Sequence, residues 1–408
     1  MRNAIFTICA KNYLAQAKTL GYSVKKHCPD VDFFILLSDE IDGINIKCED
    51  FNVIESKNLP NIHSFYEMAF KYDVIEFSTS IKPYFLDILV NERGYQNVLY
   101  IDPDMVVYNS LNFLFDELET KAALLTPHIL YPYVKYEGAT SEEELLFVGI
   151  YNLGFFAVNN STTGKQIIDW WKHKLADQCY ADKEDAQHVD QRWMDFLPAL
   201  HGDNVKILRH PGMNVAFWNM HERAFSVEDG NYFVDGMPLA IFHFSGLDAH
   251  DYHNIARKQD KYNLDNKPEY LQLFKEYVDN LEKNDLAYLS KLKYKYNQYD
   301  NGVSVLPYQR RFFRTLGNKE AYKNPFITIK DSFFNLLEIN KLMIFDKDGK
   351  YIAIRKGISN VDGKIEKLKK LLIILKKTVG IKRYYLLMKF IRSHSRFEKQ
   401  AFLIEKNS

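Results

Sequence analysis

Two carboxylates follow a short apolar run in the first half of the chain. Residues 98–101 (Val-Leu-Tyr-Ile) lead directly into Asp102 and Asp104. A run this short and rich in β-forming residues predicts a buried strand. Residues two apart on an extended backbone point to the same side. Because Pro103 has no N–H for a sheet ladder, we expect regular pairing to end there.

The predicted position of these carboxylates has a chemical consequence. Open α/β sheets bind ligands just beyond the carboxyl ends of their strands. Two oxygen ligands at such a place suit Mg²⁺ or Mn²⁺ together with a phosphate-bearing substrate. An Asp-x-Asp taken alone also fits a turn with two solvated acids. Both interpretations of Asp102 and Asp104 stay open on this motif alone.

The composition bounds the class of protein. A chain of 408 residues is long enough for one large domain with an appendage, and 47% hydrophobic residues indicate a globular protein. The formal net charge of zero argues against binding of nucleic acid by the whole protein. Neither a signal-peptide pattern in residues 1–10 nor an apolar run long enough for a membrane span is evident.

The cysteines point to a reducing compartment. They lie far apart and form no Cys-x-x-Cys pair, which argues against a zinc site or a disulfide framework. The four are Cys9, Cys28, Cys48 and Cys179. We therefore expect a cytoplasmic protein.

Apolar runs alternate with helical patterns through most of the chain. Strands are expected over residues 4–9, 33–37, 51–54, 98–101, 122–126, 151–159, 205–208 and 239–243, and helices over 14–27, 63–72, 81–92 and 163–176. This alternation predicts a mostly parallel α/β sheet with right-handed crossovers. The turn after the first strand lacks Gly-x-Gly-x-x-Gly, so the dinucleotide fingerprint is absent.

The last third of the chain has a different texture. Helical segments rich in tyrosine and lysine run from Leu264 to about Lys323, and a basic amphipathic stretch follows Ile358. That stretch fits either contact with an anionic membrane or a partner, or ordinary packing of surface helices. The expected division is an α/β catalytic domain over 1–262, a helical extension over 263–330 and a basic region over 331–408.

Further polar landmarks follow the Asp pair in order. They are Asn152-Leu-Gly154, Asp190-Gln191 and His243-Phe-Ser-Gly246. Over roughly residues 5–262, the set resembles the retaining, metal-dependent glycosyltransferases of family 8, and more closely bacterial enzymes of polysaccharide assembly. The resemblance implies a GT-A fold, a Rossmann-like mixed sheet flanked by helices, here with a helical basic C-terminal extension.

The resemblance implies a metal centre. Asp102, Asp104 and His243 would hold Mn²⁺ or Mg²⁺, with Asp102 also reaching the nucleotide ribose. Such a metal stabilises the charge on the leaving nucleoside diphosphate. A lone histidine after an apolar strand is also often structural.

The resemblance also implies a donor-sugar site with catalytic roles for Asn152, Asp190 and Gln191. Asn152 would bind the sugar, Gly154 would let it approach the backbone, and Asp190 and Gln191 would lie near its anomeric carbon. A front-face displacement is expected, with a covalent intermediate on Asp190 as the alternative. Plainer interpretations are an Asn-Gly turn or bulge and an exposed helix N-cap at Asp190.

The nucleotide would lie in the loop after the first strand. Ala10, Asn12 and Tyr13 match the residues that hold the base and ribose of UDP in the family. Lys82 matches a basic residue near the diphosphate, although it equally fits an ordinary surface lysine. Residues 214–219 read mainly as core and as a wall of the acceptor pocket.

One position departs from the family. Its members often carry a lysine three residues after the His-x-x-Gly, where this chain has Ala249. Arg257, Lys258 and His250 are the alternative cations for the diphosphate, and Lys258 is the candidate that we name.

The expected activity is transfer of a hexose from a UDP-sugar to a hydroxyl of a glycan or lipid-linked glycan, in synthesis of surface polysaccharide, lipopolysaccharide or capsule. Peripheral contact with the inner face of the membrane is expected through the basic region. Two other readings remain. Asp102-x-Asp104-x-Val106 also fits an aspartyl-phosphate hydrolase, and a degenerate domain would only bind a sugar nucleotide.

Overall fold

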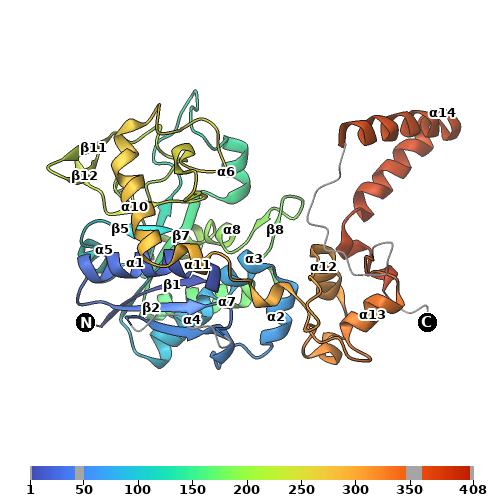
Figure 1. Ribbon diagram of the computed structural model, residues 1–408, viewed down its shortest axis with the longest axis horizontal. Coiled ribbons are helices and arrows are strands. Elements are labelled where there is room, and N and C mark those ends of the chain that lie inside the picture. The colour runs from blue at the N-terminus through green and yellow to red at the C-terminus, as the bar shows by residue number, and fades with distance from the viewer. Residues whose placement is uncertain (1, 42–49, 346–360, 405–408) are drawn as a thin grey trace. The chain divides into compact units, whose positions relative to one another are not determined.

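The computed structural model describes residues 2–41, 50–345 and 361–404 (Figure 1). The chain divides into two compact units. One comprises Met1–His63 and Val74–Lys295, and the other Ser64–Asp73 and Tyr296–Ser408. Every residue expected to take part in the chemistry belongs to the first unit. Cys48 and part of the basic region lie outside the described residues.

A seven-stranded sheet forms the centre of the first unit, in the order β10-β6-β7-β4-β1-β2-β3. The strands are β1 (Asn3–Cys9), β2 (Asp32–Leu37), β3 (Asn52–Glu55), β4 (Asn97–Ile101), β6 (Ala123–Pro127), β7 (Tyr151–Asn159) and β10 (Val205–Ile207). Among the described strands of this sheet, β7 alone runs antiparallel to both of its neighbours. The expected α/β architecture with a mixed, mostly parallel sheet is confirmed.

The central strands are buried on both faces, which explains their continuous apolar runs. All five residues of β4 are buried, and so are the eight residues of β7 before Asn159. Helices cover the faces of such a sheet, so alternation of polar and apolar residues is not needed. The expected positions of these strands are confirmed.

A separate two-stranded sheet begins directly after Asp102 and Asp104. β5 (Met105–Val107) pairs antiparallel with β14 (Ile241–His243), and Met105 lies opposite His243. The predicted interruption of pairing at Pro103 is confirmed, because β4 ends at Ile101 and the chain enters β5 after it.

The helices of the first unit are α1 (Leu14–His27), α3 (Val74–Ser80), α4 (Lys82–Asp87), α5 (Asn112–Leu118), α6 (Glu142–Val148), α7 (Thr162–Asp177), α8 (Gln191–Met194), α9 (Leu197–His201), α10 (Leu271–Lys283) and α11 (Leu286–Leu289). Small β elements are β8 (Ala181–Asp182), β9 (Gln187–His188), β11 (Phe225–Glu228), β12 (Asn231–Val234) and β13 (Met237–Pro238). The expected single helix over 81–92 is wrong in detail, since α4 ends at Asp87 and a π-helical turn, η3 (Ile88–Glu92), follows.

The second unit is helical. It contains α2 (Phe65–Lys71), α12 (Pro307–Thr315), α13 (Phe333–Ile339) and α14 (Val361–His394). The buried guanidinium of Arg310 donates to the carbonyls of Ala69, Phe70 and Tyr72, which joins α2 to the C-terminal helices. Among the helices in the described ranges, none is both long and apolar enough to cross a bilayer.

Candidate metal centre and nucleotide site

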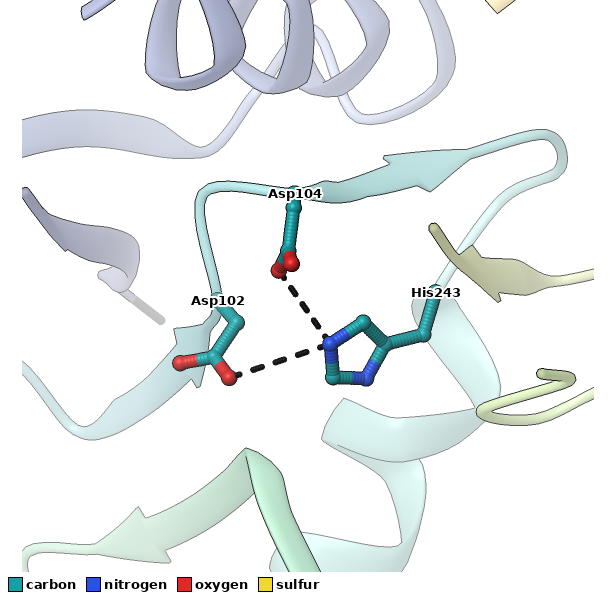
Figure 2. Close-up of side chains that lie close together, drawn as sticks. All are labelled: Asp102, Asp104 and His243. Carbon is teal, nitrogen blue, oxygen red and sulfur yellow. Dashed lines mark ion pairs between the residues drawn. The ribbon is translucent and has the colours of Figure 1, made fainter. Parts of the chain in front are cut away.

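The structure brings Asp102, Asp104 and His243 together at the carboxyl edge of the sheet. Figure 2 shows one ring nitrogen of His243 facing both carboxylates. Nε2 of His243 lies 3.1 Å from Oδ1 of Asp104 and 4.0 Å from Oδ2 of Asp102. One ligand atom from each residue lies within 4.8 Å of the others. Two carboxylates and one imidazole at this spacing fit a divalent metal ion.

Backbone hydrogen bonds fix the three side chains. The Asp102 N–H donates to the carbonyl of Gly154 on β7 at 2.7 Å. The N–H of Phe244, next to His243, donates to the carbonyl of Asp104 at 2.9 Å. The ligands therefore sit on paired backbone rather than on a free loop, which limits their movement.

Gly154 is required by the close approach of these ligands. A Cβ placed on this residue would lie 2.7 Å from Cε1 of His243 and 3.0 Å from Oδ2 of Asp102. The first distance is shorter than real Cβ contacts, and the second is tighter than most of them. The glycine expected to make room for a sugar thus makes room for two candidate metal ligands.

Asn214 orients His243 from behind. Nδ1 of His243 lies 3.3 Å from Oδ1 of Asn214. An amide oxygen only accepts, so Nδ1 carries a proton, and Nε2 is the ring nitrogen that faces the carboxylates. The Trp218 ring packs edge-on against the imidazole at 5.1 Å. Such outer contacts fix the tautomer and ring plane of a metal-binding histidine.

The network continues to Asn152 and His128. The Asn214 amide donates to Oδ1 of Asn152 at 3.0 Å, and Nδ2 of Asn152 lies 3.2 Å from Nε2 of His128. Burial lowers the pKa of His128 to about 4, so its ring is neutral near pH 7 and accepts this bond. The structure therefore places Asn152 behind His243, with both ends of its amide bonded within the protein.

Electrostatics favour an ionised Asp104. Burial raises the pKa of its carboxyl, but His243 and then Lys258 lower it by more, so the pKa lies below its usual range. An ionised carboxylate is the form that binds a metal.

Lys82 is buried beside the carboxylates. Its side chain is 2% exposed, and Nζ lies 2.8 Å from Oδ2 of Asp190 and 3.9 Å from Oδ1 of Asp102. Nζ also donates to the carbonyl of Leu153 at 2.9 Å. The interpretation of Lys82 as an ordinary surface lysine is therefore wrong.

Asp190 and Gln191 begin helix α8 but have different environments. Asp190 is buried and its side chain makes no capping bond, so its interpretation as an exposed N-cap is wrong. Burial raises the pKa of Asp190 by more than Lys82 lowers it. Gln191 accepts from the N–H of Leu153 at 3.0 Å and donates to the carbonyl of Val148 at 2.7 Å. Its amide thus ties α6 to the start of β7.

A cavity of about 310 Å³ borders the metal centre. Its walls include Asp104 together with Asn12 and Tyr13, which lie on the short helix η1 (Lys11–Tyr13) directly after β1. Ala10 is buried at the start of this turn, where its carbonyl accepts from the N–H of Tyr13 at 2.9 Å. Residues from two distant segments thus line one cavity beside the carboxylates.

Two of the three alternative cations line this cavity, and the third lies beside one of its lining residues. Arg257 and His250 line the cavity. The Lys258 side chain lies over Gly246, and its charge lowers the pKa of Asp104. Lys258 is therefore the alternative whose charge acts on a candidate metal ligand.

Sequence reasoning missed the orienting roles of Asn214 and His128. Asn214 was expected only to be core or acceptor wall, yet it links His243 to Asn152. Its backbone lies in the left-handed region (φ 51°), where asparagine is enriched among non-glycine residues. No periodicity or motif spacing marks such a residue in advance.

No family model matches the chain. Two proteins of Bacillus subtilis (strain 168) are similar in sequence. The uncharacterized protein YfnF is 29% identical over 256 residues, which cover 60% of this chain and 82% of YfnF. The uncharacterized protein YfnD is 22% identical over 259 residues, which cover 59% of this chain and 76% of YfnD.

Solved structures of glycosyltransferases are similar at low identity. The glycosyltransferase GlyE of Streptococcus pneumoniae TIGR4 has 18% identity and a TM-score of 0.39, over 72% of this chain and 66% of GlyE, a little under two thirds of its length. The galactosyltransferase LgtC, solved with donor and acceptor sugar analogues, has 17% identity and a TM-score of 0.41, over 68% of this chain and 95% of LgtC.

The orienting bond from Asn214 predicts a loss of metal affinity when it is removed. We expect Asn214→Gly, which tolerates the left-handed backbone, to weaken Mn²⁺ binding about 10- to 100-fold by freeing the His243 ring. Isothermal titration with Mn²⁺ measures this. Asp229→Gly, at an exposed position of similar φ (50°), is the matched control. Unchanged affinity in Asn214→Gly would contradict the orienting role.

The buried pair of Lys82 and Asp190 predicts a coupled stability effect. We expect Lys82→Met to lower the free energy of unfolding by about 3–5 kcal/mol, because it leaves a buried carboxylate without its cation. Lys82→Met combined with Asp190→Asn should lose less. Denaturant unfolding measures both, with exposed Lys165→Met as control. Strictly additive losses would show that the two side chains do not interact.

Proposed function

We propose that the chain is a metal-dependent glycosyltransferase of the GT-A type, similar to family 8. It transfers a hexose from a nucleotide sugar, UDP-linked, to a hydroxyl of a glycan acceptor with retention of configuration. One observation carries the proposal: Asp102, Asp104 and His243 meet at the carboxyl edge of a mixed sheet beside a cavity that Asn12 and Tyr13 line.

The donor set supports a metal of the manganese type. Asp102 and Asp104 offer oxygens, and His243 offers Nε2, the ring nitrogen that Asn214 does not contact. Mg²⁺ prefers oxygen ligands alone, whereas Mn²⁺ lies higher in the affinity order for sites that include nitrogen. When bound, the metal supplies positive charge against the leaving nucleoside diphosphate.

The chain's own residues bind the nucleotide in this proposal. Asn12 and Tyr13 hold the base and ribose, and Ala10 supplies the backbone of the turn. Lys258 faces the diphosphate, since its charge already acts on Asp104. The cavity of about 310 Å³ lies within the usual range of small-molecule sites.

For the sugar we propose a polar pocket around Asp190. Lys82 keeps this buried carboxylate paired, so Asp190 accepts hydrogen bonds from sugar hydroxyls close to Asp102. In this proposal Asn152 and Gln191 form walls of the pocket, and their bonds to the backbone and to neighbouring amides hold them in place. In a front-face displacement the leaving phosphate takes the acceptor proton, and no protein base is needed.

The donor set also weighs against the hydrolase reading. An aspartyl-phosphate hydrolase needs a further acidic pair near its two aspartates. Among the described residues, one group that could hold a metal contains Asp102 and Asp104, and its third member is His243. An imidazole at that position supports the transferase reading.

Hydrolysis of the donor without an acceptor tests the proposal. We expect one member of a panel of nucleotide sugars to release UDP with Mn²⁺ and not with chelator. Asp104→Ala and His243→Ala should lower the rate about a hundredfold or more, since even outer-shell losses cost 10- to 100-fold. A coupled assay for released UDP measures the rate, and exposed Asp279→Ala serves as control.

The outcomes separate the three readings. Metal-dependent UDP binding without turnover of any donor would contradict catalysis and favour the binding module. Phosphatase activity on an aryl phosphate that depends on Asp102 would favour the hydrolase. If neither UDP binding nor turnover is found, Asp102 and Asp104 are better explained as two solvated acids in a turn.

We further propose that the acceptor is a glycan or lipid-linked glycan of surface polysaccharide synthesis, and that α14 contacts the inner face of the membrane. This element bends at Gly380, where two helices meet, and apolar side chains are exposed on both of them. They include Leu368, Leu371, Ile374, Leu386 and Phe390. Lysines and arginines lie between them, a combination that suits an anionic bilayer surface.

Neutralising the basic side chains of α14 tests the membrane proposal. We expect replacement of four lysines by glutamine to reduce flotation with vesicles containing phosphatidylglycerol, because surface lysines contribute about 1 kcal/mol each. The four are Lys369, Lys370, Lys376 and Lys377. The same four changed to arginine keep the charge and form the control. Equal flotation of both variants would exclude the electrostatic contact.

A further inference from the structure

A second cavity in the described part of the chain lies outside the metal centre. Its volume is about 730 Å³, more than twice that of the cavity beside Asp104. Helices α1 and α10, strand β5 and the turn of the β11–β12 hairpin form its walls. This size is typical of sites that hold a small organic ligand, and no residue of the proposed reaction lines it.

The floor and the rim of this cavity differ in polarity. Val106 and Val107 of β5 are buried at the floor. Tyr108 and Tyr232 pack edge-on against each other beside them, with ring centroids 5.4 Å apart. A ligand seated here meets apolar and aromatic surface on one side. Sugars have such a side, because each pyranose ring carries C–H groups on its faces and hydroxyls at its edge.

The polar groups of the cavity include both acceptors and donors. The amide nitrogens of Asn109 and Asn284 donate to Leu239 and Thr19, so their carbonyl oxygens are left as acceptors. The side-chain amide of Asn280 makes no hydrogen bond to any described residue.

The charged groups at the edge of the cavity are mixed. Glu276 accepts from the Tyr232 hydroxyl at 2.8 Å, and Lys26 and Lys283 add donors. Hydroxyls both donate and accept, so they satisfy such a mixture, whereas a phosphate only accepts and would face the Glu276 carboxylate.

We infer that this cavity is a second carbohydrate site, which binds a neutral oligosaccharide apart from the metal centre. It borders the metal centre through one side chain: Tyr277 lines both cavities and stacks on Phe244, next to His243, with centroids 3.8 Å apart. The inference goes beyond the proposed transfer reaction and does not require turnover.

Direct binding to the full chain tests the inference. The probes are four neutral disaccharides: lactose, maltose, cellobiose and chitobiose. Saturation-transfer NMR at millimolar sugar, without metal or nucleotide, is expected to detect binding of at least one. Asp102→Asn combined with Asp104→Asn should bind it equally well, since the site is separate from the carboxylates.

Filling the cavity provides the decisive variant. Asn280→Trp adds bulk at an exposed position of α10 on the cavity wall, and we expect it to weaken binding roughly tenfold or more, a loss of about 1.4 kcal/mol or more. Glu282→Trp, also exposed on α10 but outside the cavity, should leave binding unchanged. Circular dichroism establishes that both variants fold.

Three results would overturn the inference. They are no binding of any of the four disaccharides, binding that Asn280→Trp leaves intact, and binding that the Asp102/Asp104 variant abolishes. The last would assign the sugar to the metal centre instead. Donor hydrolysis is measured separately, so failure of the transferase proposal and failure of this one remain distinguishable.

Discussion

The pairing of β5 with β14 is the contact on which the candidate site depends. Asp104 immediately precedes one strand and His243 ends the other, so their antiparallel register decides whether the imidazole reaches the carboxylates. A shift of one residue would turn His243 to the opposite face of this small sheet. Pro103 contributes by ending the ladder of β4, which lets the chain cross from the main sheet into this pair.

Behind the pair lies a buried polar network. Asn214 connects His243 to Asn152, and Asn152 connects to His128. Each side chain in this network forms a hydrogen bond with the next one. A buried polar group without its partner costs about 1–3 kcal/mol. The network therefore has one favourable arrangement, and that arrangement holds Nε2 of His243 toward Asp102 and Asp104. Site geometry and folding specificity have the same physical origin here.

The positions of the charged side chains around the site are also fixed by their partners. Lys82 is the cation for two carboxylates, at 2.8 Å from Asp190 and 3.9 Å from Asp102. Burial of such a group is costly unless it is paired, which ties Lys82 to this position. Lys258 and His243 act on Asp104 from the other side. A lysine charge thus acts on each of the two carboxylates before any metal binds.

The sequence by itself determined the α/β alternation, the strand that ends at Asp102 and the interruption at Pro103, because strand and turn chemistry are local. Its motifs also identified Asp102, Asp104 and His243 as candidate metal ligands. Only the tertiary structure decided that Lys82 is buried, that Asp190 is not an exposed cap and that Asn214 orients His243. These properties depend on contacts between segments far apart in the chain, and residue type and spacing carry no information about burial or partner across such distances.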